Sequence, residues 1–156
     1  MPTIEDRLAE LGIVLPEVAA PVAAYVPAVV DGSHVYVSGQ LPFVSGVLPE
    51  TGKVGDGHGL VPEDDARDFA RICALNGLAA AKAVLGSLDR ISRVVKVTGF
   101  VASEPGFISQ AAVINGASLV LGEIFGDAGV HARSAVGVAV LPLDSPVEVE
   151  LILAID

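Results

Sequence analysis

The stretch RSAVGVAVLPLDSPVEVELILAI, residues 133–155, decides the fold. It holds two apolar runs, 134–141 and 147–155, separated by a short segment with prolines at both ends. Within each run every second residue is apolar, which is typical of a β-strand with one buried face. We therefore expect the chain to end in two long strands that pair as a C-terminal hairpin.

The patterns upstream predict two main helices and further strands. The clearest helix opens with the acidic turn Glu63-Asp64-Asp65, where the helix dipole favours negative charge, and stops at Gly86. The expected elements are a capped helix at 3–11, an extended segment at 18–24, a hairpin at 25–38, at most a short strand at 44–48, the helix at 62–85, a strand at 91–101 and a second helix at 107–125.

This order predicts an α+β fold with one mixed β-sheet and two helices on one face. We expect a single domain, 1–156, with residues 1–15 as an N-terminal helical extension. No helix is left to cover the other face of the sheet. Because 52% of the residues are apolar and only 18% are charged, such a face needs a partner subunit.

Composition and charge exclude several classes of protein. The net charge of −10 repels phosphate backbones and argues against nucleic-acid binding. No apolar stretch reaches the length of about 18 residues that a membrane helix needs, despite a mean hydropathy of +0.64. The acidic N-terminus lacks the pattern of a signal peptide, and the single cysteine, Cys73, excludes an internal disulfide. We expect a cytoplasmic protein that binds neither nucleic acid nor membranes.

Several candidate sites fail on their residue pattern. The glycine-rich segment 52–59 lacks the ending of a phosphate-binding P-loop, and acidic residues follow it. The three histidines lie in separate elements, so no metal site is predicted. Cys73 lies on the apolar stripe of the long helix and is expected to be a buried thiol. Ser38 is not in the nucleophile motif of serine hydrolases. No metal and no cofactor are expected.

Arg133 is the residue that points to chemistry. Its neighbours on the same strand face are Ala135, Gly137 and Ala139, which leave space beside a guanidinium that could hold a small carboxylate in two hydrogen bonds. Glu148 and Glu150 share one face of the next strand, which we expect to be the Arg133 face. The alternative is a solvated sheet edge with a structural ion pair, and spacing alone favours that alternative.

A set of motifs is spread over most of the chain, from about residue 24 to 155. Its members are Tyr25, Val35-Tyr36-Val37-Ser38-Gly39-Gln40-Leu41-Pro42, Asn115, Ala132-Arg133-Ser134, Leu141-Pro142 and Val147-Glu148-Val149-Glu150. Taken together, these motifs resemble the RidA (YjgF) family of enamine/imine deaminases, whose members are also labelled endoribonuclease-like or translation-inhibitor-like.

The resemblance implies a chorismate-mutase-like fold of the bacillary type, in a homotrimer whose sheets form a central barrel. Three sites would lie in the clefts between subunits, with no cofactor. Arg133 would grip the carboxylate of a 2-imino or 2-enamino acid, and Glu148 would position or activate the attacking water. The further pocket residues implied are Tyr25, Ser38, Gly39, Asn115 and Ala135.

The implied activity is hydrolysis of a reactive imine to a 2-keto acid and ammonia. Two alternatives stay open: a non-catalytic trimer that binds a small carboxylate in a regulatory or scaffolding role, and a ribonuclease, which the negative charge and the few aromatic residues oppose. The chain departs from the family pattern at Ala135, where cysteine is frequent, at His131, where proline is frequent, and in its longer 39–59 region. These departures predict a divergent branch, and they leave the natural substrate open.

Overall fold

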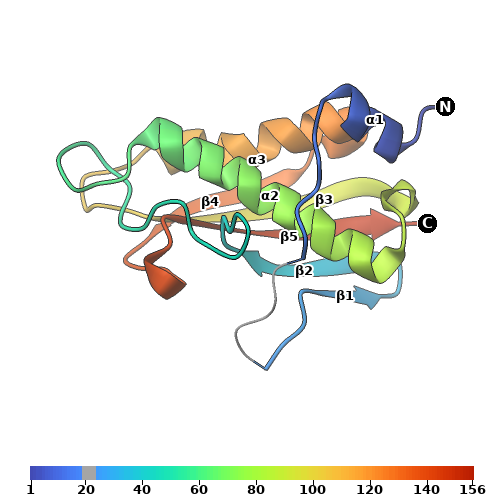
Figure 1. Ribbon diagram of the computed structural model, residues 1–156, viewed down its shortest axis with the longest axis horizontal. Coiled ribbons are helices and arrows are strands. Elements are labelled where there is room, and N and C mark those ends of the chain that lie inside the picture. Colours follow the sequence, from blue (N-terminus) through green and yellow to red (C-terminus); the bar gives the residue numbers. More distant parts are fainter. Residues whose placement is uncertain (19–23) are drawn as a thin grey trace.

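A single mixed sheet of five strands organises the chain, with both long helices packed on the same face (Figure 1). The computed structural model describes residues 1–18 and 24–156, so most of the predicted extended segment at 18–24 lies outside the described residues. The elements are α1 Ile4–Glu10, β1 Ala28–Asp31, β2 His34–Gln40, α2 Glu63–Leu85, β3 Ile91–Ala102, α3 Gln110–Phe125, β4 Ala132–Val138 and β5 Val147–Ile155, with short 3-10 turns at Leu88–Arg90, Gly126–Gly129 and Pro142–Asp144. The α+β class, the mixed sheet and the placement of the helices are as predicted.

The C-terminal hairpin predicted from residues 133–155 is wrong. The strand order is β1-β2-β5-β3-β4, so β3 lies between β4 and β5. β5 is antiparallel to both β2 and β3, whereas β4 runs parallel to β3 at the edge of the sheet. Because β5 is the strand with the most continuous apolar face, the central position buries that face and satisfies both of its hydrogen-bonding edges.

The register of the sheet assigns each residue to one of two faces. Val149, Leu151 and Leu153 of β5 are buried beneath the helices. A Cβ at Gly77 of α2 would lie 2.9 Å from Leu151 Cδ1, so the absence of a side chain lets the helix approach the strand closely. The opposite face has no helix among the described residues. It presents the apolar side chains Val29, Tyr36, Phe100, Val136 and Ile152, all of them partly or fully exposed.

The helices begin and end close to where the sequence places them. α2 starts after Pro62 with three acidic residues in its first turn and ends at Gly86, whose φ of 82° suits glycine. α3 begins at Gln110, three residues after the predicted Phe107, because residues 104–107 form a turn closed by the Phe107 N–H and the Glu104 carbonyl at 2.9 Å. Between β2 and α2 the chain forms isolated bridges and no regular strand among the described residues.

The N-terminal extension is attached to the rest of the domain. A capping box between Thr3 and Asp6 starts α1. The Arg7 Nε–H donates to the Glu123 carbonyl at 2.9 Å, and the Ile4 N–H donates to Asp89 Oδ1 at 2.6 Å. Leu8 is buried in the common core. The extension is therefore packed against the end of α3 and the turn that precedes β3.

The segment Gln110–Gly129 is long and apolar enough to cross a membrane, by length and composition only, with a mean hydropathy of 1.2. A core helix passes the same test. The side chains of Val113, Ile114, Val120 and Leu121 in α3 are fully buried within the domain, and the helix packs against α2, β3 and β4. These contacts favour the core-helix interpretation.

Candidate functional site

Arg133 lies on the edge strand β4 and faces the helices. Its register partner is Val97, which is fully buried under α3. The guanidinium lies along one face of α3: Nη1 donates to Asn115 Oδ1 at 2.8 Å and to Ser118 Oγ at 3.2 Å, and Nη2 donates to the Ala111 carbonyl at 3.3 Å. Among the described residues, Nε–H and the second hydrogen of Nη2 have no acceptor. Arg133 is thus held on one side, and two of its donors remain unused by the described residues.

Two polar residues that the sequence analysis did not assign to the site join this group. His131 Nε2 lies 2.9 Å from Ser118 Oγ, and His131 Nδ1 lies 2.6 Å from the Gly129 carbonyl. A signal for both is visible in the sequence: residues 111, 115 and 118 share one face of a helix, and His131 precedes Arg133 by two residues in extended chain. Once α3 packs over β4, those spacings place Ser118 and His131 beside the guanidinium.

The space predicted beside Arg133 is only partly present. Ala135 is half-buried and packs against the core, next to Gly99 of β3. A Cβ at Gly137 would lie 2.8 Å from Gln110 Nε2, so the Gln110 side chain already occupies that end of the strand face. The small residues therefore leave room at Ala135, close to the guanidinium, and not along the whole strand.

The other predicted site residues form a second group around the end of β2. Ser38 Oγ donates to the Val26 carbonyl at 2.7 Å, which places it next to the exposed Tyr25. Gly39 lies against Glu148, because a Cβ at that glycine would collide with Glu148 Oε1. Glycine at this β2 position therefore makes room for the carboxylate, and a larger residue would displace it.

The expectation that Glu148 and Glu150 share the Arg133 face is wrong. Glu148 pairs with Phe100 and Glu150 with Thr98, whereas Arg133 pairs with Val97, one residue out of step. Because successive residues of a strand point to opposite faces, both glutamates lie on the open face and Arg133 lies on the helix face. Neither glutamate forms an ion pair within the described part of the chain.

One protomer therefore holds the predicted site residues in two separate groups. Tyr25, Ser38, Gly39 and Glu148 lie around β2 and the start of β5, and Asn115, Arg133 and Ala135 lie at the β4 edge. The strand β3 separates β5 from β4. Neither group alone contains both a cation and a carboxylate.

Glu148 is a weaker acid in this fold than an ordinary glutamate. Partial burial, followed by the negative charge of Glu150 on the same face, raises the pKa of Glu148 above its usual range. A carboxylate with a raised pKa is a better proton acceptor near neutral pH than an ordinary glutamate. Burial is also the main cause that raises the pKa of the Cys73 thiol, which agrees with its predicted place in the core.

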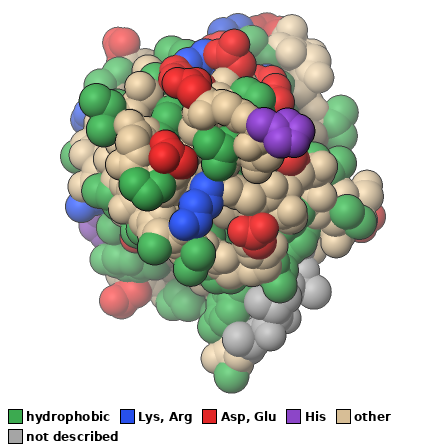
Figure 2. Space-filling view, turned by 90° about the vertical axis from the view of Figure 1, so that its left-hand side faces the viewer, with side chains coloured by type: hydrophobic (Ala, Val, Ile, Leu, Met, Phe, Trp, Pro, Cys, Tyr) green, Lys and Arg blue, Asp and Glu red, His purple; other side chains and the backbone are tan. Residues whose placement is uncertain are grey.

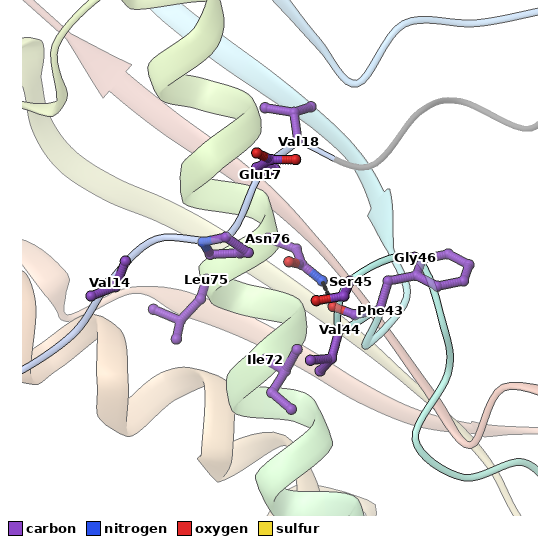
Figure 3. Close-up of a pocket in the computed structure, with 11 residues that line it drawn as sticks. Val14, Glu17, Val18, Phe43, Val44, Ser45, Gly46, Ile72, Leu75 and Asn76 are labelled. Atoms are coloured by element: carbon purple, nitrogen blue, oxygen red, sulfur yellow. Dashed lines mark hydrogen bonds between the residues drawn. The ribbon is translucent and has the colours of Figure 1, made fainter.

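A cavity of about 840 Å³ lies away from both groups, on the outer side of α2 (Figure 3). Its wall is mostly apolar and comes from three segments: residues 14–18, residues 43–46 and the α2 residues Ile72, Leu75 and Asn76. None of the predicted site residues lines it. This cavity is therefore separate from the Arg133 and Glu148 groups.

A smaller hollow of about 200 Å³ has acidic walls at Asp56, Glu63 and Glu104. Residues 1–18 and 24–156 contain no group of three or more potential metal ligands.

The end of the molecule that carries the β2–α2 loop shows mostly acidic residues among its charged side chains (Figure 2). Such a surface repels a polyanion.

Comparison with known proteins places the chain among relatives along nearly its whole length. Residues 5–155 match a family described as YjgF/chorismate mutase-like, whose description adds endoribonuclease as a suggested activity. The chain is 43% identical to the protein TCP17 of Trypanosoma cruzi, over 98% of this chain and 94% of that one.

Solved structures agree with this fold. The protein Atu1372 from Agrobacterium tumefaciens, described as of unknown function, is 48% identical with a TM-score of 0.89, over 98% of this chain and 92% of that one. TdcF from E. coli, solved with bound serine, is 28% identical with a TM-score of 0.59, over 92% of this chain and 96% of that one.

Proposed function

Because this chain belongs to the YjgF/chorismate mutase-like family, which includes the RidA proteins, we propose that it hydrolyses 2-imino or 2-enamino acids to 2-keto acids and ammonia. The reaction takes place in pockets between the subunits of a homotrimer. The observation that supports this most is the separation of Arg133 from Glu148 within one protomer. A pocket that needs both residues is completed only when the β4 edge of one copy meets the β2 end of another.

The open sheet face supports the trimer. Val29, Tyr36 and Val136 are each more than 40% exposed on that face, although all three are large apolar residues. Three such sheets packed around an axis form a barrel that removes this apolar surface from water. The proposed partners are therefore two further copies of the chain and a small anionic carboxylate, with no nucleic acid and no membrane.

In this mechanism Arg133 fixes the substrate. Its free Nε–H and Nη2–H bind the two carboxylate oxygens side by side. Glu148 of the neighbouring copy accepts a proton from a water as the oxygen attacks the imine carbon, giving a carbinolamine. Glu148 returns that proton to the nitrogen and then relays the proton of the carbinolamine hydroxyl to the same nitrogen as the C–N bond breaks, so that ammonia leaves and a 2-keto acid remains. No cofactor is required because the imine carbon is already electrophilic, and the site supplies orientation and proton transfer.

A pH profile tests the role of Glu148. With imino acids generated by an amino-acid oxidase, the wild type is expected to speed keto-acid release beyond the uncatalysed rate, and Glu148→Gln to reduce that gain about 100-fold. Because Glu148 must be ionised to accept a proton and its pKa is raised, the wild-type rate rises with pH through a range above the ordinary glutamate pKa.

Glu150→Gln is the matched control for this test. It keeps the rate and moves the acid limb to lower pH, because the charge of Glu150 contributes to the raised pKa of Glu148. A wild-type protein that leaves the rate of keto-acid release unchanged would overturn the proposed function.

A matched pair of surface substitutions tests the trimer. Val136 on the open face and Val84 on α2 are 43% and 44% exposed. Val136→Glu is expected to convert the trimer into monomers, because it places a charge in the proposed barrel, whereas Val84→Glu leaves the mass unchanged. Sedimentation velocity measures both. If the wild type is a monomer, or if Val136→Glu remains a trimer, the proposed assembly is wrong.

One observation favours a second function, a trimer that binds a carboxylate without turnover. Ala135 offers no acid, base or nucleophile at a position beside Arg133. The related TdcF was solved with serine, which also carries a carboxylate. A rise in melting temperature with pyruvate, without acceleration of imine hydrolysis, would select this function.

A ribonuclease is less favoured, because the net charge is −10 and the charged side chains on the surface in Figure 2 are mostly acidic. A cytoplasmic location is part of the proposal and fits the single buried thiol.

A further inference from the structure

We infer that Ser118 and His131 are positioning residues that fix the guanidinium of Arg133 for carboxylate binding. Three hydrogen bonds carry the inference: Arg133 Nη1 to Ser118 Oγ at 3.2 Å, Ser118 Oγ to His131 Nε2 at 2.9 Å, and His131 Nδ1 to the Gly129 carbonyl at 2.6 Å. We call these four groups the relay. The inference rests on the proposed function, because it assigns Arg133 to the carboxylate.

With a neutral imidazole at His131, the chemistry of the groups allows one direction for the relay. The Gly129 carbonyl can only accept, so His131 Nδ1 carries a hydrogen and donates it. In the neutral ring Nε2 then has a free lone pair and accepts the hydroxyl hydrogen of Ser118. The guanidinium can only donate, so Ser118 Oγ accepts from Arg133 Nη1. Each bond polarises the next in the same direction, which strengthens the chain.

His131 changes what Ser118 can do for Arg133. A serine within a helix commonly donates its hydroxyl to the carbonyl four residues earlier, which turns the oxygen lone pairs toward the helix. In the relay the imidazole accepts that hydrogen instead, because His131 Nε2 lies 2.9 Å from Ser118 Oγ. The lone pairs of Ser118 Oγ then point at the guanidinium, where they hold the second hydrogen of Nη1.

The relay sets which edge of Arg133 is free. Asn115 and the Ala111 carbonyl accept from the first Nη1 hydrogen and from Nη2. With Ser118 as the third acceptor, the plane of the guanidinium is fixed at three points along α3, and Nε with one Nη2 hydrogen stays available. Without Ser118 the plane can rotate about the remaining two bonds, so a carboxylate would have to order it on binding, at a cost in affinity.

Nuclear magnetic resonance of the protein, labelled with ¹⁵N, tests the relay without any measurement of activity. The expected result is a His131 ring protonated at Nδ1 and not at Nε2. The Arg133 Nε–H signal should exchange slowly with water, and more quickly in Ser118→Ala and His131→Phe. Ser109→Ala and His58→Phe are the controls, because the Ser109 side chain makes no capping hydrogen bond at the start of α3 and His58 is exposed in the loop before α2.

Binding of pyruvate, followed by calorimetry, measures the consequence. Ser118→Ala and His131→Phe should weaken pyruvate binding about 3- to 10-fold, in line with the loss of one hydrogen bond of ordinary net strength. His131→Gln should restore affinity to within about twofold of the wild type, because its amide oxygen can accept from Ser118. Both controls should bind pyruvate as the wild type does.

The outcomes separate the relay from the proposed function. A His131 ring protonated at Nε2, or an Arg133 signal that is unchanged in Ser118→Ala, would overturn the relay. Unchanged pyruvate affinity in Ser118→Ala and His131→Phe would overturn its role in binding. If the wild type binds no pyruvate, the proposal that Arg133 binds a carboxylate is wrong, and so is the role of the relay in binding. The tautomer of the His131 ring and the exchange rate of the Arg133 Nε–H still decide whether the relay exists.

Discussion

Replacement of Arg133 with alanine is expected to weaken the binding of pyruvate about 30- to 1000-fold, with a similar fall in the rate of imine hydrolysis. In the proposed site, the Nε–H and the Nη2–H that have no acceptor among the described residues would provide two charge-assisted hydrogen bonds to a carboxylate. Their combined loss is worth about 2–4 kcal/mol. The negative net charge makes the loss of pyruvate affinity larger, because an anionic ligand is attracted only by a local cation.

Lysine at position 133 separates charge from geometry. An ammonium keeps the positive charge, but it cannot bond Asn115, Ser118 and the Ala111 carbonyl while it also presents two parallel donors to a ligand. Arg133→Lys should therefore lose about 10- to 100-fold in pyruvate affinity. Calorimetry with pyruvate and the oxidase-coupled rate measure both variants.

Arg71 offers the matched control. It is an exposed arginine on α2 that pairs with Glu123 at 3.4 Å, so Arg71→Ala and Arg71→Lys remove a surface cation without touching the relay. Both should change pyruvate affinity by less than about twofold. If Arg133→Ala binds pyruvate and hydrolyses imines as well as the wild type, then Arg133 is a structural edge residue and the carboxylate site lies elsewhere.

Local patterns predict the elements of this fold well, and pairing across the sheet less well. The acidic first turn and Gly86 delimit α2, and β5 coincides with the apolar run at 147–155, since both depend on neighbours in sequence. The order of the strands depends on contacts between distant segments. Two consecutive apolar strands can pair with each other or with a third, and the alternation of residues 133–155 is the same in both cases.

The same difference between local patterns and contacts of distant segments limits what the sequence predicts about the site. Strand alternation shows that Glu148 and Glu150 share a face, and that Arg133 and Ala135 share a face. It does not relate the faces of two strands until their register is known, and the register places the two pairs on opposite sides of the sheet. Asn115 was identified by resemblance and lies against Arg133, but its role there depends on α3 packing over β4.

Substitution of Gly116 with alanine is expected to have the largest effect on stability, lowering the free energy of unfolding by about 3 kcal/mol. Gly116 is buried where α3 crosses α2, and a Cβ there would collide with the backbone carbonyl of Arg67. A backbone carbonyl within a helix cannot rotate away from a new methyl group as a flexible side chain can. The two helices would have to separate, which would also stretch the bond from Arg67 Nε to the Ala112 carbonyl, now 3.0 Å.

Substitution of Gly122, on the same helix, is expected to change the free energy of unfolding in the opposite direction. A Cβ at Gly122 would meet nothing within 4 Å, so Gly122→Ala only exchanges a poor helix former for the best one. It should stabilise the protein by about 0.5–1 kcal/mol. Denaturant unfolding at a fixed chain concentration measures both variants, because dissociation of an oligomer makes stability depend on concentration. Equal and small effects of the two substitutions would mean that α2 and α3 do not approach each other as closely at Gly116 as the structure places them.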